Sequence, residues 1–99
     1  MELEKREKLI ELYDLYSNLL TEKQKDYFEN YYFDDLSLAE IAEDNNVSRN
    51  AIHDMLKKSV EELLKYEEKM NLAKKIEKIK ELVKDDKLKG EILDIIWEE

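Results

Sequence analysis

The amino-acid sequence predicts an all-α fold, a helix-turn-helix domain with an extended C-terminal helical tail. Three observations support this prediction. Leu, Glu and Lys are abundant while the chain has one glycine and no proline. Apolar residues recur at spacings of three and four along most of the chain, and paired capping residues mark helix starts. Because 99 residues suit one small core, we expect residues 1–99 to form a single helical domain, with the helix-turn-helix at about 37–66 and the extension at about 67–99.

The first half of the predicted motif begins at a capping box. Ser37 is followed three residues later by Glu40, so each side chain can satisfy a backbone N–H group that a helix start leaves unpaired. We expect this helix to run from near Leu38 to about Asp44. Asn45 and Asn46 follow, and asparagine tolerates the left-handed conformation of a sharp turn. Val47 is predicted to be buried in that turn.

The second half of the motif begins at Ser48, a residue type that caps helices. Its predicted inner face follows from the spacing of the apolar residues, which are Ile52, Met55, Leu56, Val60, Leu63 and Leu64. Small Ala42 and Ala51 are expected where the two helices pack closely. Ser59 with Glu62 also matches a capping box but lies within this periodic stretch, so we interpret it as part of one helix.

The remaining positions of the second helix form a predicted outer face, which carries Arg49, Asn50, His53, Asp54 and Lys57. In DNA-binding helix-turn-helix proteins, the N-terminal positions of the second helix reach base edges in the major groove. Arg49, Asn50, His53 and Lys57 are therefore candidate DNA contacts, with Lys58 as an electrostatic helper. An ordinary solvated helix surface is the alternative.

Two helices are predicted before the motif. The first spans about Leu3 to Asn18, with an apolar stripe of Leu9, Leu12, Tyr13, Tyr16 and Leu19. The second begins at a capping box of Thr21 and Gln24 and ends before Asp34 and Asp35. It places Tyr27, Phe28, Tyr31 and Tyr32 at helical spacing. We favour an aromatic core over a base-stacking platform for these rings.

The tail continues the helical pattern through Met70, Leu72, Ile76, Ile79, Leu82 and Val83. The second helix of the motif either runs on into this stretch or bends near Asn71. Asp85 and Asp86 can cap a last helix, which contains Leu88, Ile92, Leu93, Ile96 and Trp97 and is weakened by Gly90.

The formal net charge of −9 argues against strong binding of nucleic acid, since phosphate neutralisation supplies much of that affinity. The charge is unevenly placed. Residues 26–44 hold seven acidic side chains and no basic one, residues 45–60 carry +2, and residues 69–80 carry +4. Basic patches can therefore persist on an acidic body.

Several classes of protein are disfavoured by composition. With no cysteine and one histidine, the chain lacks thiolate metal sites and the usual catalytic spacings. We therefore expect no enzyme activity and no cofactor. The start lacks a secretory pattern, and no apolar run approaches the roughly 20 residues of a membrane span, so we expect a cytoplasmic protein.

The stretch from Leu19 to Leu72 resembles the YlxM family of small bacterial helix-turn-helix proteins, themselves similar to region 4 of sigma-70-type factors. The phrases LTEKQ, YYFDDLSLAEIAE, VSRNAI and YEEKMNL carry this resemblance. It implies an all-helical fold and a regulatory role linked to the signal recognition particle pathway. Asn46 stands where the sigma-like proteins often have glycine.

Two functions remain open from the sequence. The first is a DNA-binding regulatory protein that takes part in the signal recognition particle pathway. The second is a protein- or RNA-interaction module that modulates the particle's GTPase through an acidic face or the stretch from Lys69 to Lys80. A homodimer is expected, because the tail has more apolar stripe than a four-helix core covers; the first helix and the Met70 to Val83 stripe are its expected surfaces.

Overall fold

The computed structural model describes residues 6–97, which form six α-helices and one short 3-10 helix. In chain order these are α1 (Arg6–Tyr16), η2 (Ser17–Leu19), α2 (Glu22–Tyr32), α3 (Leu38–Asn45), α4 (Arg49–Met70), α5 (Leu72–Leu82) and α6 (Asp86–Trp97). The prediction of an all-α fold is confirmed. The first helix ends at Tyr16, two residues earlier than expected, and its predicted start at Leu3 lies outside the described residues.

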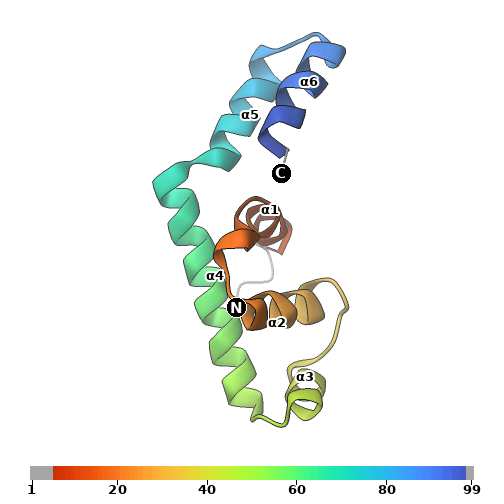
Figure 1. The fold of residues 1–99 in the computed structure, drawn as a ribbon, viewed down its shortest axis with the longest axis vertical. Coiled ribbons are helices and arrows are strands. Elements are labelled where there is room, and N and C mark those ends of the chain that lie inside the picture. The colour runs from red at the N-terminus through yellow and green to blue at the C-terminus, as the bar shows by residue number, and fades with distance from the viewer. Residues whose placement is uncertain (1–5, 98–99) are drawn as a thin grey trace.

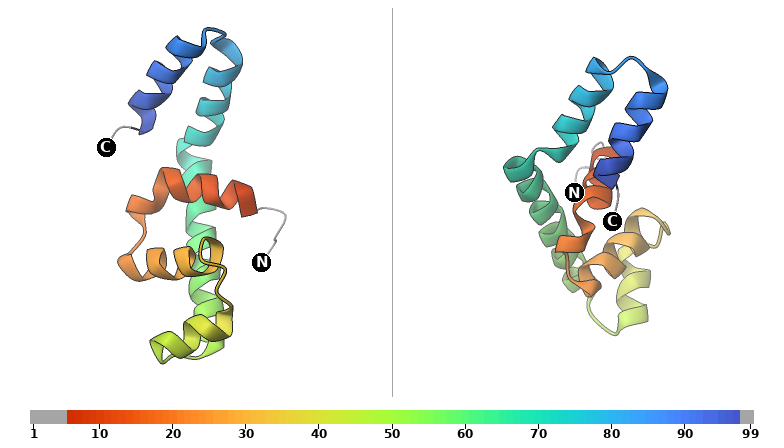
Figure 2. Two further views of the ribbon diagram at one scale, coloured as in Figure 1. Left: turned by 90° about the vertical axis from the view of Figure 1, so that its right-hand side faces the viewer. Right: turned by 45° about the horizontal axis from the view of Figure 1, so that its top comes forward.

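The longest helix, α4, is the element on which the others are arranged (Figures 1 and 2). Helices α1, α2 and α3 each contact it, while α5 contacts α1 and α6. The molecule is elongated, with principal extents of 50 × 25 × 23 Å. The helix-turn-helix of α3 and α4 lies at one end, and the hairpin of α5 and α6 lies at the other.

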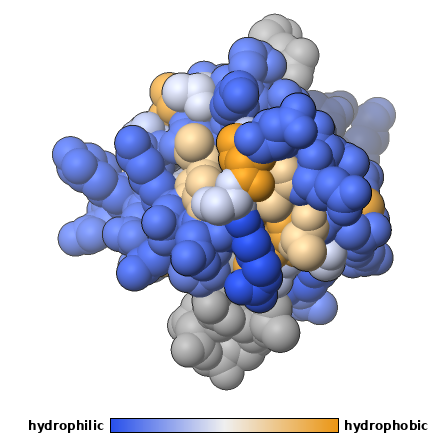
Figure 3. Space-filling model, turned by 90° about the horizontal axis from the view of Figure 1, so that it is seen from below, coloured by the Kyte–Doolittle hydropathy of each residue, from blue (hydrophilic) through white to orange (hydrophobic). Residues whose placement is uncertain are grey.

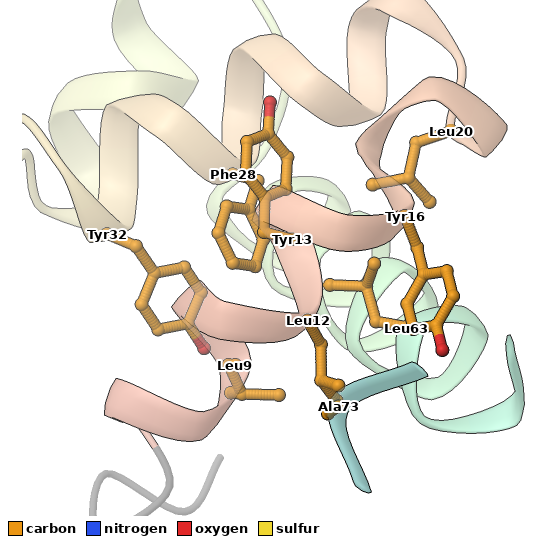
Figure 4. Packing of buried hydrophobic residues seen from close by; sticks show 9 residues of the cluster. All are labelled: Leu9, Leu12, Tyr13, Tyr16, Leu20, Phe28, Tyr32, Leu63 and Ala73. Carbon is orange, nitrogen blue, oxygen red and sulfur yellow. The ribbon is translucent and has the colours of Figure 1, made fainter. Parts of the chain in front are cut away.

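The main core lies where α1 and α2 cross α4 (Figure 4). Its buried residues are Leu9, Leu12, Tyr13, Tyr16, Leu20, Phe28, Tyr32, Leu63 and Ala73. The rings of Tyr13 and Phe28 stack at 4.3 Å between centroids and 3° between planes. This confirms the aromatic core. The stripe prediction is wrong at Leu19, which is 51% exposed because η2 turns the chain away before Leu20 re-enters the core.

The predicted capping residues form the expected bonds. At the start of α2 the Thr21 hydroxyl accepts from the Gln24 amide at 3.2 Å, and the Gln24 side chain accepts from the Thr21 amide at 2.8 Å. The Asp85 carboxylate accepts from the Leu88 amide at 2.9 Å and so caps α6. Ser59 lies inside α4 and donates to the Met55 carbonyl, in agreement with its interpretation as a helix-interior residue.

The chain bends between α4 and α5 at Asn71, which decides the alternative left open by the sequence. Asn71 has a left-handed backbone, with φ of 56° and ψ of 30°. The buried carboxylate of Glu67 then accepts from the amides of Ala73 at 3.1 Å and Lys74 at 3.4 Å. These are N–H groups that the new helix start leaves without intrahelical partners. A side chain near the end of α4 thus caps the helix that follows it.

Candidate nucleic-acid interface

A tight turn joins α3 to α4 and sets the shape of the candidate interface. Ser37 and Glu40 form the predicted capping box at the start of α3, with bonds of 3.0 and 3.1 Å. At its end Asn46 has a φ of 55°, as its residue type predicted. The Asn46 amide donates to the Glu43 carbonyl at 3.3 Å and the Val47 amide to the Ala42 carbonyl at 3.1 Å. This pair of bonds is a Schellman motif, which satisfies carbonyls at the helix end.

The packing between the two helices differs in part from the prediction. Tyr27, Ile41, Ala42, Ile52 and Leu56 form a second buried cluster beneath the turn. The prediction that Val47 is buried is wrong, because Val47 is 40% exposed and its side chain is not part of that cluster.

Two positions of α4 were also assigned to the wrong face. Ala51 is exposed, and Leu64 is 44% exposed. Both predictions depended on which face of α4 is turned toward the neighbouring helices, and apolar spacing alone did not determine that for these two residues. The buried face of α4 is centred on Ile52, Leu56, Ser59 and Leu63, and at about 100° per residue Ala51 lies on one flank of that face and Leu64 on the other.

The outward face of α4 is the one opposite its buried face. An α-helix turns about 100° per residue, so the positions opposite the buried stripe are those near Asn50, Asp54, Lys57 and Glu61, and all four are exposed. Ser48 caps the helix start by accepting from the Ala51 amide at 3.0 Å. The first turns of α4 lie beside α3 at one end of the molecule (Figure 1).

The predicted contact residues are grouped on these first turns. Arg49, Asn50, Lys57 and Lys58 are exposed, and none of their side chains has an ion-pair or hydrogen-bond partner within residues 6–97. His53 is half-buried, and its Nδ1 lies 3.5 Å from a carboxylate oxygen of Asp54. Arg49 and His53 lie toward one edge of the face and Lys58 toward the other, so the face carries its basic groups on both flanks.

Two features of this surface were not among the predicted site residues. Asp54 occupies the middle of the outward face, between the flanking basic side chains. The end of the molecule also carries an apolar patch surrounded by hydrophilic residues (Figure 3). Around the turn of the motif, between residues 38 and 52, the exposed apolar residues are Ala39, Val47 and Ala51. Helical periodicity assigns small apolar residues to the core, so no sequence signal pointed to this patch.

Residues 6–97 hold neither a metal-binding cluster nor a membrane-spanning helix. No group of three or more His, Asp or Glu side chains in that range is placed to hold a metal ion. No helix in the same range is both long and apolar enough to cross a membrane.

The fold and the exposed second helix define a helix-turn-helix protein. The chain belongs to the UPF0122 family, whose model, described as "Putative helix-turn-helix protein, YlxM / p13 like", matches residues 3–95. It is 45% identical over 103 residues to the UPF0122 protein YlxM of Bacillus subtilis, covering 97% of this chain and 94% of that protein. It is also 56% identical over 73 residues to a UPF0122 protein of Clostridium botulinum, covering 74% and 67% of the two chains. The family resemblance drawn from the sequence is confirmed.

Proposed function

We propose that this protein binds DNA through the first turns of α4 and acts as a regulatory protein. The observation that carries the proposal is the group of exposed side chains on these turns, Arg49, Asn50, Lys57 and Lys58, none of which is engaged within residues 6–97. Arg and Asn are the side chains that read guanine and adenine through paired hydrogen bonds. Lysines on the flank suit phosphates. Exposed Ala51 and Val47 suit the methyl group of thymine.

The acidic body limits how this binding works. Residues 6–71 hold nine Arg and Lys side chains against sixteen Asp and Glu, a net charge of −7. Long-range attraction to phosphates is therefore weak. We propose that specific binding requires a homodimer, which presents two copies of α4 to half-sites about 34 Å apart.

The test is a binding selection on genomic fragments followed by anisotropy titrations at several salt concentrations. Arg49→Ala and Lys57→Ala should weaken binding to a selected site without changing the melting temperature, and each lost phosphate contact should reduce the log-log salt slope by about one unit. Lys65→Ala is the matched control and should have no effect, because Lys65 is exposed on the same helix but more than four turns away from Arg49. If no fragment is enriched, or if the control weakens binding equally, the proposal is wrong.

A second candidate function has its own supporting observation. Acidic residues on α2, α3 and the intervening loop, Asp26, Asp34, Glu43 and Asp44, are exposed and unpaired within residues 6–97. Such a surface suits a basic protein, and a module modulating the signal recognition particle GTPase is the alternative that the family resemblance implies. A pull-down with that GTPase tests it. Charge reversal at Asp34 and Glu43 should abolish capture, while Arg49→Ala should not.

A further inference from the structure

We propose that the hairpin of α5 and α6 is the surface through which two copies of this chain associate. Helix α6 has twelve residues, yet none of them is buried. Four large apolar side chains of the hairpin are unusually exposed: Leu82 at 78%, Ile95 at 70%, Leu88 at 49% and Trp97 at 45%. A twelve-residue helix is marginal in water without a covered apolar face. The side of α6 that carries Leu88 and Ile95 therefore has no cover within residues 6–97.

The amount of exposed apolar surface suits a second copy. Helical geometry puts Trp97 on the opposite side of α6 from Leu88 and Ile95, so Trp97 does not share their surface. At roughly 100 Å² for a large apolar side chain, the exposed parts of the other three residues present about 200 Å² per copy, and two copies bury about 400 Å² from these residues alone. A standard interface buries about 1,600 Å² in total, rather more than half of it apolar. The half-buried Ile92 and Ile96 and the stems of neighbouring lysines supply further area.

The distribution of charge also favours this surface over others. Residues 72–97 hold seven lysines against six acidic residues, a net charge of +1, whereas residues 6–71 carry −7. Two acidic bodies repel one another at short range. The hairpin lies at the opposite end of the 50 Å molecule from the helix-turn-helix (Figure 1). Contact between two hairpins therefore brings together the part of the described chain with the smallest net charge.

The structure also corrects the surface expected from the sequence. The apolar stripe of α1 is not available, because Leu9, Leu12, Tyr13 and Tyr16 are buried in the main core. In the Met70 to Val83 stripe, Ala73 and Ile76 are likewise buried. What remains exposed is Leu82 at the end of α5 and the side of α6 that carries Leu88 and Ile95. The proposal does not depend on DNA binding, and a dimer can form whether or not α4 reads DNA.

Sedimentation of the full chain from about 1 to 200 µM tests the proposal, with a dimer expected within this range. The double substitution of Leu82→Glu and Ile95→Glu should leave a monomer of unchanged circular dichroism at 222 nm, since both side chains are largely exposed. Leu19→Glu with Leu64→Glu, also exposed but on the body, is the control and should remain dimeric. A wild-type monomer at 200 µM, or a dimer that only the control pair disrupts, overturns the proposal.

A cross-linking experiment covers the case in which the double variant loses helix. The chain has no cysteine, so a single Ile95→Cys substitution introduces one thiol at the proposed surface. Mild oxidation should convert it to a disulfide-linked dimer at low micromolar concentration, whereas Leu64→Cys should stay monomeric. Equal cross-linking of the two variants, or cross-linking of Leu64→Cys alone, contradicts the proposed surface. The proposed dimer surface is also contradicted if the protein is a monomer and the α5–α6 hairpin binds RNA.

Discussion

The hydroxyl of Tyr16 donates a 2.7 Å hydrogen bond to the carboxylate of Glu67, joining two residues that are 51 positions apart. Both side chains are buried, with Tyr16 2% and Glu67 7% exposed. The same hydroxyl accepts from the Leu72 amide at 3.1 Å. Burial and the neighbouring carboxylate raise the pKa of Tyr16 to about 12. This pair holds α1, the end of α4 and the start of α5 in one network.

Removing one member of this network should destabilise the protein. Tyr16→Phe leaves a buried carboxylate with one fewer donor, which typically costs about 1–3 kcal/mol in the free energy of unfolding. Urea unfolding measures the loss, and hydrogen exchange should show faster opening at the amides of Ala73 and Lys74. The control is Tyr66→Phe, whose hydroxyl makes a long, exposed bond of 3.4 Å to Leu19. If both variants lose the same free energy of unfolding, the hydrogen bond from Tyr16 to Glu67 contributes no more to stability than an exposed one.

Acid should weaken the bend between α4 and α5. Burial raises the pKa of Glu67, but the bonds from Tyr16, Ala73 and Lys74 outweigh it, so the pKa is lowered below its ordinary value. A lowered folded-state pKa contributes stability that is present above the unfolded value of about 4.3 and is lost as the pH falls through the folded value. Glu67→Gln should remove this part of the acid dependence. The unfolding free energies of wild type and variant, measured from pH 7 to pH 3, should therefore converge.

The left-handed backbone of Asn46 should make the stability of the protein sensitive to the residue type at this position. Because glycine adopts positive φ without steric cost, Asn46→Gly should be neutral or slightly stabilising. Asn46→Ala should destabilise by about 1 kcal/mol, since a Cβ without a local hydrogen-bonding group disfavours this conformation. Thermal unfolding of the two variants measures the difference. If alanine and glycine melt together, the turn is not held in the left-handed conformation.

Substitutions of two apolar residues near the turn, Ile52 and Val47, should differ in their effect on stability because only Ile52 is buried. Ile52 is 0% exposed, and Ile52→Ala should cost about 2–5 kcal/mol. Val47 is 40% exposed. Val47→Asp should therefore lower the free energy of unfolding much less than it would if Val47 were buried, as the sequence had predicted. Denaturant unfolding of both variants is the measurement. A larger loss at Val47 than at Ile52 would contradict the packing of this motif.

Asp54 in the middle of the outward face should oppose DNA binding. Asp54→Asn removes one negative charge there, and surface charge effects of about 0.2–1 kcal/mol predict up to about fivefold tighter binding at low salt. Anisotropy titration with a selected DNA fragment checks this. Glu68→Gln, an exposed carboxylate near the other end of α4, is the control with the same change in net charge. Should both variants tighten binding equally, the effect is one of net charge and not of position.

Local signals in the sequence determined the helices, their caps and the type of turn. Ser37 with Glu40, Thr21 with Gln24, and the Asp85 cap act within one turn of helix, so residue type and spacing suffice to predict them. Asn46 was predictable for the same reason, since its left-handed backbone is a local preference. The candidate residues Arg49, Asn50, Lys57 and Lys58 were likewise placed on an exposed face by periodicity alone.

Contacts between distant segments decided the rest. The capping of α5 by Glu67 and Tyr16 depends on α1 packing against the end of α4, and no local pattern contains that information. The exposure of Val47, Ala51 and Leu64 follows from how far α4 is rotated against its neighbours. Leu88 and Ile95 of α6 are exposed, and the main core contains no residue of this helix. A helix's apolar spacing predicts that it will be covered, but only packing determines by which partner.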